Sequence, residues 1–156
     1  MKLLVVAVGH KMPDWITTGF NEYAKRMPRE ARLELIEIKP EPRTSGKNAA
    51  QIMQAEAQRI LTAIPGDTLR IVLDEQGAHL STRQMSQQLQ TWMGSGQNAA
   101  FIIGGADGLH PSVKNAATQV LALSTMTLPH GLVRVLLSEQ LYRACSLLHN
   151  HPYHRE

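Results

Sequence analysis

Apolar residues along the chain form short runs that alternate with longer stretches of helical periodicity. Short runs rich in Val, Ile and Leu are typical of strands buried on both faces of a parallel sheet. They predict five strands, at residues 3–8, 33–38, 69–73, 99–103 and about 120–123. Glycine, charged or other polar residues flank each run, as is typical of strand ends.

The segments between these runs repeat apolar residues at spacings of three and four, as the buried face of a helix requires. They predict four helices, over about residues 13–28, 48–64, 82–93 and 132–148. Ser81 is the expected N-cap of the third helix. Strands that alternate with helices predict an α/β fold in which helices cover both faces of a mostly parallel sheet. With 156 residues, we expect one domain over residues 1–156.

Ligands of open parallel sheets bind beyond the carboxyl ends of the strands. That rule selects residues 9–12, 73–77, 104–108 and 124–130. The last two belong to the stretch from Ala99 to His130. No charged residue occurs between Asn115 and Val133, although 19% of the chain is charged. A segment of this kind is buried or lines a pocket, so we predict a ligand cradle there.

Two motifs in the cradle each allow two interpretations. The glycines of residues 104–108 would let a ligand approach the backbone, because no Cβ intervenes, but they also suit a plain tight turn. They do not form the Gly-x-Gly-x-x-Gly pattern of dinucleotide sites. Residues 124–127 offer hydroxyls, backbone groups for an adenine edge and the soft Met126 for a methionyl tail, or else a simple Ser/Thr turn.

The last eight residues contain three histidines, a tyrosine and an arginine. Pro152 keeps this segment extended, and Glu156 is the one carboxylate near the histidines, so we predict no metal site. The segment is either a frayed terminus or a tail that carries acid-base and phosphate-binding groups over a pocket.

Composition leaves the partner open. A net charge of +3 and a pI near 9.2 permit nucleic-acid binding, but an ordinary solvated surface would show the same balance. The lone Cys145 lies on an apolar helical face, which indicates a buried thiol and fits a reducing cytoplasm. We predict neither a signal peptide nor a membrane span.

Four segments together resemble one family: residues 11–15, 101–108, 121–130 and 150–156. The chain is identified as a member of the ribosomal RNA large-subunit methyltransferase H family, in the SPOUT or α/β-knot superfamily. The resemblance implies S-adenosylmethionine-dependent methylation of N3 of a pseudouridine in large-subunit rRNA of assembled ribosomes. It also implies a homodimer and a C-terminal trefoil knot, an exception to the usual absence of knots.

In such proteins the cofactor lies at the end of the third strand, at the glycine turn and in the knot loop. On this chain those positions are Leu73, Gly104, Leu123, Ser124, Thr125, Met126, Thr127 and Leu128. The resemblance further implies that the active site lies at the dimer interface. The tail of one subunit would then complete the pocket of the other.

The imide N3 of a pseudouridine is protonated at neutral pH, so its methylation requires a general base. His154 is our first candidate and His130 the second. Arg143 and Arg155 would hold phosphate or a developing uracil oxyanion, and Tyr153 would stack on or position the base.

Two other classes of function stay open. A Rossmann-like nucleotide-binding enzyme or open-sheet methyltransferase would place its glycine fingerprint after the first strand, where this chain has Gly9, and an acid after the second, where it has Glu37. A ribosome-binding module without catalysis would bind no S-adenosylmethionine.

Overall fold

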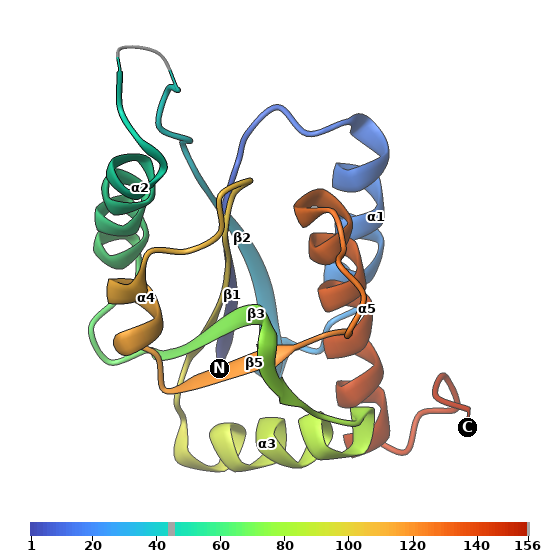
Figure 1. The fold of residues 1–156 in the computed structure, drawn as a ribbon. Coiled ribbons are helices and arrows are strands. Elements are labelled where there is room, and N and C mark those ends of the chain that lie inside the picture. The colour runs from blue at the N-terminus through green and yellow to red at the C-terminus, as the bar shows by residue number, and fades with distance from the viewer. Residues whose placement is uncertain (44–45, 156) are drawn as a thin grey trace.

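Five parallel strands form one sheet in the computed structural model, which describes residues 1–43 and 46–155 (Figure 1). Glu156, the end of the predicted tail, lies outside the described residues. The strands lie in the order β2-β1-β4-β3-β5. Their bounds are β1 Lys2–Val8, β2 Arg32–Ile38, β3 Leu69–His79, β4 Ala99–Ile103 and β5 Gln119–Ala122.

Helices cover both faces of this sheet (Figure 1). One layer contains α5 packed against α1 and α3, and the other contains α2 and α4. Their bounds are α1 Asp14–Ala24, α2 Ala49–Ala63, α3 Thr82–Ser95, α4 Pro111–Asn115 and α5 His130–Leu148, with a short 3-10 helix at Arg29–Ala31. The predicted α/β architecture is confirmed.

The central strands are buried on both sides. Alternate residues of β1 point to opposite faces: Leu3 and Val5 join the core beneath α1, α3 and α5, whereas Leu4 and Val6 join the core beneath α2 and α4. All four side chains are at most 5% exposed. This two-sided burial explains why the run is apolar throughout and does not alternate with polar residues.

Local sequence starts two of the helices. The Asn48 side chain accepts a hydrogen bond from the backbone N–H of Gln51, whose side chain returns one to the Asn48 N–H, and Ser81 and Gln84 form the same capping box. Each box satisfies backbone donors that the first helical turn leaves without partners. The predicted cap at Ser81 is confirmed.

Other predicted boundaries were wrong. The first helix ends at Ala24 and not near Pro28, and the last begins at His130, two residues early, with Pro129 at the N-cap. The five-residue α4 was not predicted, because so short a helix shows no periodicity. The fifth strand lies one residue earlier than predicted.

The largest difference concerns β3, which we expected to end at Leu73. It continues to His79 through a bulge, so that Leu73 and Ala78 both lie opposite Leu121 of β5. The polar segment between them is typical of a loop and hides the continuation. Gly77 permits it, because a Cβ there would lie 2.6 Å from the backbone carbon of Leu121.

Substitution of Gly77 should therefore test the bulge. Gly77→Ala is expected to lower the free energy of unfolding by about 1–3 kcal/mol, since the two strand backbones would have to separate. The matched control is Gly94→Ala near the end of α3, where a Cβ would meet no atom within 4 Å. That control should be neutral or stabilising by up to about 1 kcal/mol. Urea denaturation at equal protein concentration measures both, and equal effects would contradict the strand pairing.

Candidate active site

A cavity of about 370 Å³ opens between the bulge of β3 and the carboxyl end of β4. This volume lies within the range of about 300–1,000 Å³ that small-molecule sites occupy. The lining combines the bulge of β3, the glycine turn after β4, the loop after β5 and the start of α5: residues 73–75, 103–106, 108–109, 123–124, 126–130 and 133. These are loops that the strand-end rule selects.

Most of the residues expected to bind the cofactor line this one cavity. They are Leu73, Gly104, Leu123, Ser124, Met126, Thr127 and Leu128. Thr125 belongs to the same loop but does not contribute to the lining. His130, the second candidate for the base, lies on the cavity wall at the first residue of α5.

The glycine turn brings backbone close to the cavity. A Cβ on Gly104 would lie 2.9 Å from Leu109 Cγ and 3.0 Å from the backbone carbon of Gly108. Gly108 has a φ of +82°, which favours glycine, and its N–H donates to the Gly105 carbonyl at 3.0 Å. The tight turn and the exposed backbone are therefore one feature, and the two interpretations of this motif do not exclude each other.

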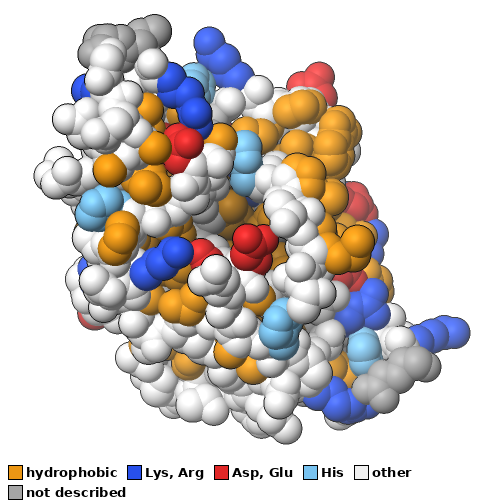
Figure 2. Space-filling model, viewed as in Figure 1, with side chains coloured by type: hydrophobic (Ala, Val, Ile, Leu, Met, Phe, Trp, Pro, Cys, Tyr) orange, Lys and Arg blue, Asp and Glu red, His pale blue; other side chains and the backbone are white. Residues whose placement is uncertain are grey.

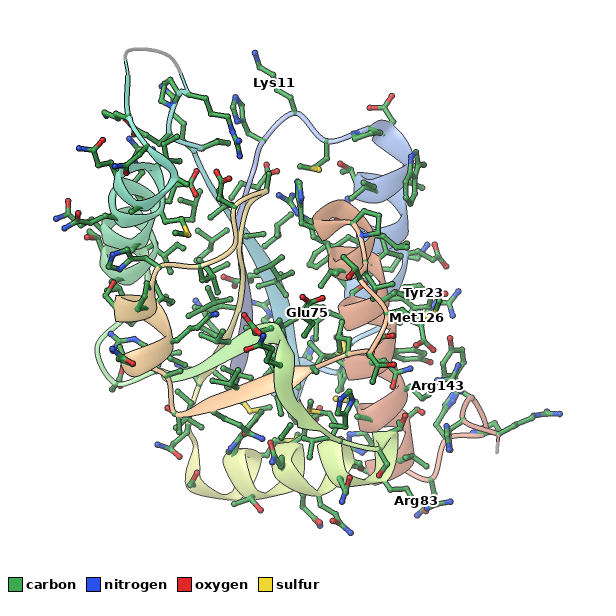
Figure 3. The ribbon with its side chains drawn as sticks, viewed as in Figure 1. Lys11, Tyr23, Glu75, Arg83, Met126 and Arg143 are labelled. Atoms are coloured by element: carbon green, nitrogen blue, oxygen red, sulfur yellow. The ribbon has the colours of Figure 1, made fainter. Side chains whose placement is uncertain are left out.

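The loop after β5 forms the Ser/Thr turn that its sequence allows. The Met126 N–H donates to Ser124 Oγ at 2.9 Å, and the Met126 side chain is 74% exposed. The Thr127 hydroxyl donates to Glu75 Oε2 at 3.0 Å, which ties this loop to the bulge of β3. Figure 3 shows Glu75 on that bulge, and Met126 on the loop beside α5.

The cavity contains two carboxylates in different electrostatic surroundings. Asp74 lies 2.8 Å from Lys114 Nζ and accepts the Gln76 N–H at 2.9 Å. The Lys114 ammonium, followed by that backbone N–H, lowers the pKa of Asp74 below its usual value. Glu75 has the Thr127 hydroxyl as its partner, and no cationic side chain in the described part of the chain pairs with it.

A buried arginine supports the cavity wall behind His130. The Arg134 side chain is 1% exposed, contacts Glu37 Oε2 at 2.8 Å and donates to the Gly9 carbonyl at 3.1 Å. A Cβ on Gly9 would lie 2.8 Å from Met12 Cε and 4.0 Å from His130 Nε2. In a dinucleotide-binding fold, an acid after the second strand would bind the ribose. Here the corresponding residue, Glu37, forms an ion pair with Arg134 instead.

The chain reverses direction after α5. Asn150 takes a left-handed conformation with φ +54°, the His151 N–H donates to the Ser146 carbonyl at 2.9 Å, and the Asn150 N–H donates to the Leu147 carbonyl at 3.3 Å. This is the hydrogen-bond pattern of a Schellman motif, with Asn in place of the usual Gly. The tail consequently packs back against α5, which excludes the frayed terminus.

Three of the predicted catalytic residues meet around Glu139 on this side of α5. The Tyr153 hydroxyl donates to Glu139 Oε1 at 3.1 Å, and Arg143 Nε donates to the same oxygen at 2.7 Å. The Arg143 guanidinium lies 4.7 Å from the centroid of the Tyr153 ring, and its Nη1 lies 3.3 Å from His154 Nδ1. The Tyr142 ring packs on Tyr153 with centroids 4.7 Å apart.

Charge and burial set the protonation states in this tail cluster. Burial, with the nearby Glu139 carboxylate, raises the pKa of Tyr153 to about 12, so the phenol remains a hydrogen-bond donor at neutral pH. The hydrogen bond to Glu139 raises the pKa of Arg143 further above its usual value. Burial likewise raises the pKa of the Cys145 thiol to about 12, which confirms a buried thiol without nucleophilic character.

The cavity and the tail cluster are separate within one subunit. Arg143 follows His130 by thirteen residues on the same helix, which corresponds to about 20 Å at 1.5 Å per residue. Figure 1 shows the C-terminus beyond the far end of α5. Arg155 is exposed past the cluster. The structure thus divides the predicted site residues between His130 with the cavity and His154, Tyr153 and Arg143 with the tail.

Sequence reasoning missed Arg134, Glu139 and Tyr142. A lone arginine within the otherwise apolar run from Leu132 to Leu137 was a usable signal for Arg134. The spacing of four between Glu139 and Arg143 was another, because such pairs meet on one helix face.

Two findings bear on other classes of site. In residues 1–43 and 46–155, no group of three or more His, Cys, Asp or Glu side chains has the arrangement to hold a metal ion. Over the same residues, no helix is both long and apolar enough to cross a membrane.

Comparisons with known proteins agree with this architecture. A family model described as "Predicted SPOUT methyltransferase" matches residues 1–154. Curated relatives named ribosomal RNA large subunit methyltransferase H include proteins of Nitrosospira multiformis and Bordetella avium. They are 59% and 58% identical to this chain over 155 residues, covering 99% of both chains in each pair.

Solved structures support the fold at much lower identity. A protein from Haemophilus influenzae described as a "probable methylase family protein" has a TM-score of 0.53 at 13% identity, covering 99% of this chain and 70% of that one. One from Neisseria gonorrhoeae has a TM-score of 0.52 at 10% identity, covering 90% and 81%. With the family model spanning nearly the whole chain and relatives at more than half identity, this protein belongs to the SPOUT methyltransferase family.

Proposed function

We propose that this protein transfers a methyl group from S-adenosylmethionine to N3 of a pseudouridine in large-subunit rRNA, within assembled ribosomes in the cytoplasm. The observation that carries the proposal is the cavity between the glycine turn and the loop after β5, in a chain of a methyltransferase family. The names of the curated relatives support the large ribosomal subunit as the target.

The residues of the cavity fit this cofactor. Gly104 would contact it from the end of β4 and Leu73 from the start of the β3 bulge, and residues 123–128 would enclose it from the loop after β5. Apolar lining from Ile103, Leu109 and Val133 suits an adenine ring. When bound, S-adenosylmethionine supplies the methyl group on a sulfonium. We include the trefoil knot in the proposal, built from these loops and α5.

We further propose that the active protein is a homodimer in which the tail of one subunit meets the cavity of the other. The tail cluster lies about 20 Å along α5 from the cavity of its own subunit, so a second subunit is the simplest means of joining them. Figure 2 shows hydrophobic side chains gathered over the region of α1 and the start of α5. Trp15 is 58% exposed and Leu136 38% exposed on these helices, as an interface would require.

In the composite site, His154 would accept the N3 proton while the methyl group is transferred. Tyr153, held by Glu139, would position the base, and Arg143 and Arg155 would hold phosphate or the uracil oxyanion. Such a site acts mainly by aligning the two reacting atoms. His130, already on the cavity wall, is the alternative base.

Mass spectrometry of rRNA tests the proposed function. Large-subunit rRNA from a strain lacking this gene should lack one methylated pseudouridine, and complementation should restore it. Identical methylation in both strains would contradict the proposal. Calorimetry with S-adenosylmethionine separates catalysis from a binding module, since a module without catalysis should show no heat of binding.

The strand order argues against a dinucleotide-binding enzyme. Such folds commonly order their strands 3-2-1-4-5-6, with the phosphate-binding glycines after the first strand. Here the order is 2-1-4-3-5 and the glycine turn follows β4.

A further inference from the structure

We infer that Glu75 recognises the positive charge of the methyl donor and thereby makes the cavity favour S-adenosylmethionine over its uncharged thioether product. This inference rests on the proposed function. It adds a specificity-determining residue that the motifs of the sequence do not point to.

The first observation is the position of Glu75. It lies on the β3 bulge, the segment that leaves the sheet between Leu73 and Ala78 and returns through Gly77. The bulge turns Asp74 and Glu75 into the cavity lining, at the edge where the proposed cofactor residues meet.

The second observation is the charge balance of the cavity. Asp74 and Glu75 are the lining side chains with a full negative charge, and the lining of the described chain contains neither lysine nor arginine. Lys114, from α4 outside the lining, neutralises Asp74 at 2.8 Å. Glu75 has no such cation in the described residues, so the cavity keeps one uncompensated negative charge. A cationic ligand would compensate it.

The third observation is a hydrogen bond to the exposed Glu75 carboxylate. The Thr127 hydroxyl donates to its Oε2 at 3.0 Å from the loop proposed to enclose the cofactor. One oxygen therefore accepts a hydrogen bond from that loop. The other remains available to a ligand.

The donor loses its positive charge during the reaction, and this changes how strongly Glu75 attracts it. Methyl transfer breaks the bond between the methyl carbon and sulfur, and the electron pair stays on sulfur. The N3 lone pair forms the new bond to carbon, and the N3 proton passes to the base. The sulfonium charge disappears, so the attraction to Glu75 exists for the donor and vanishes for the product.

An interaction of this kind favours binding of the donor and does not accelerate the chemical step. It is strongest before the transition state and weakens as the sulfonium charge is lost, so it lowers KM for the donor without raising kcat.

Isothermal calorimetry of the full chain with S-adenosylmethionine and S-adenosylhomocysteine tests the inference. Both ligands contain the same adenosine and amino acid groups, and they differ in the charged methyl sulfonium. Glu75→Gln should weaken donor binding about three- to tenfold, the range expected for one partly solvated charge pair. It should change product binding less than about twofold.

Two further variants make the result decisive. Glu75→Asp keeps the charge and should retain the preference for the donor. Glu34→Gln makes the same charge change on the exposed face of β2, at the other edge of the sheet, and should leave both affinities unchanged. Added salt should reduce the preference of the wild type by screening.

Several outcomes would overturn the inference. An equal loss for both ligands would show that Glu75 binds a group they share, such as the ribose hydroxyls. Unchanged donor binding in Glu75→Gln, or a Glu75→Asp variant that lacks the preference, would exclude charge recognition. Failure of the wild-type chain to bind either ligand would instead contradict the proposed function itself.

Discussion

Replacing His154 with alanine should lower the single-turnover rate of rRNA methylation by about 10²- to 10⁴-fold, the usual contribution of a general base. Affinity for S-adenosylmethionine should stay near that of the wild type, because His154 lies with the tail and not in the cavity lining. Rapid-quench measurement with excess enzyme gives the rate, and calorimetry gives the affinity. The two readouts separate a catalytic loss from a lost cofactor site.

A second histidine on the same segment provides the matched control. His149→Ala removes an exposed imidazole at the end of α5 and should change the rate less than about twofold. His130→Ala tests the alternative base directly. If His154→Ala retains the wild-type rate while His130→Ala loses it, the base lies on the cavity wall. The tail would then serve binding alone.

Mixing two inactive variants should restore activity if the tail acts on the partner subunit. His154→Ala disables the tail, and Gly104→Val blocks the cavity, since even a Cβ at that position lies 2.9 Å from Leu109. A mixed dimer would contain one site with an intact cavity and an intact tail. Random exchange of equal amounts makes about half of the dimers mixed, so about a quarter of wild-type activity should return.

The design distinguishes this arrangement from a site within one subunit. If each tail served its own cavity, every site of the mixed dimer would contain one defect and no activity would return. Each variant alone, taken through the same exchange procedure, is the control for activity that the procedure itself could restore. Size-exclusion chromatography with light scattering tests the dimer itself, and a monomeric wild type would contradict the proposal.

Much of the fold could be predicted because its causes are local. A strand buried on both faces must be apolar throughout, and that fact located β1 and β4 from the run of residues alone. Ser81 lies three residues before Gln84, the spacing of a capping box, and it begins α3 as predicted. The glycine turn after β4 was also visible, since its special backbone requires glycine at fixed positions.

The features that only the tertiary structure decided depend on partners distant in sequence. β3 continues past Leu73 because its second half pairs with β5, more than forty residues later, and nothing local in the polar segment indicates that partner. Asp74 and Glu75 are adjacent and chemically alike. They differ because Lys114 of α4 reaches one of them and not the other.

The same reason applies to the candidate site. The sequence by itself determined which loops meet at the carboxyl edge of the sheet and which residue types the tail contains. It did not determine that the tail folds back onto Glu139, or that the length of α5 separates it from the cavity. The separation of the tail from the cavity follows from the rise of a rigid helix, and the contact with Glu139 follows from packing of the folded chain. Such contacts form only once the whole chain has folded.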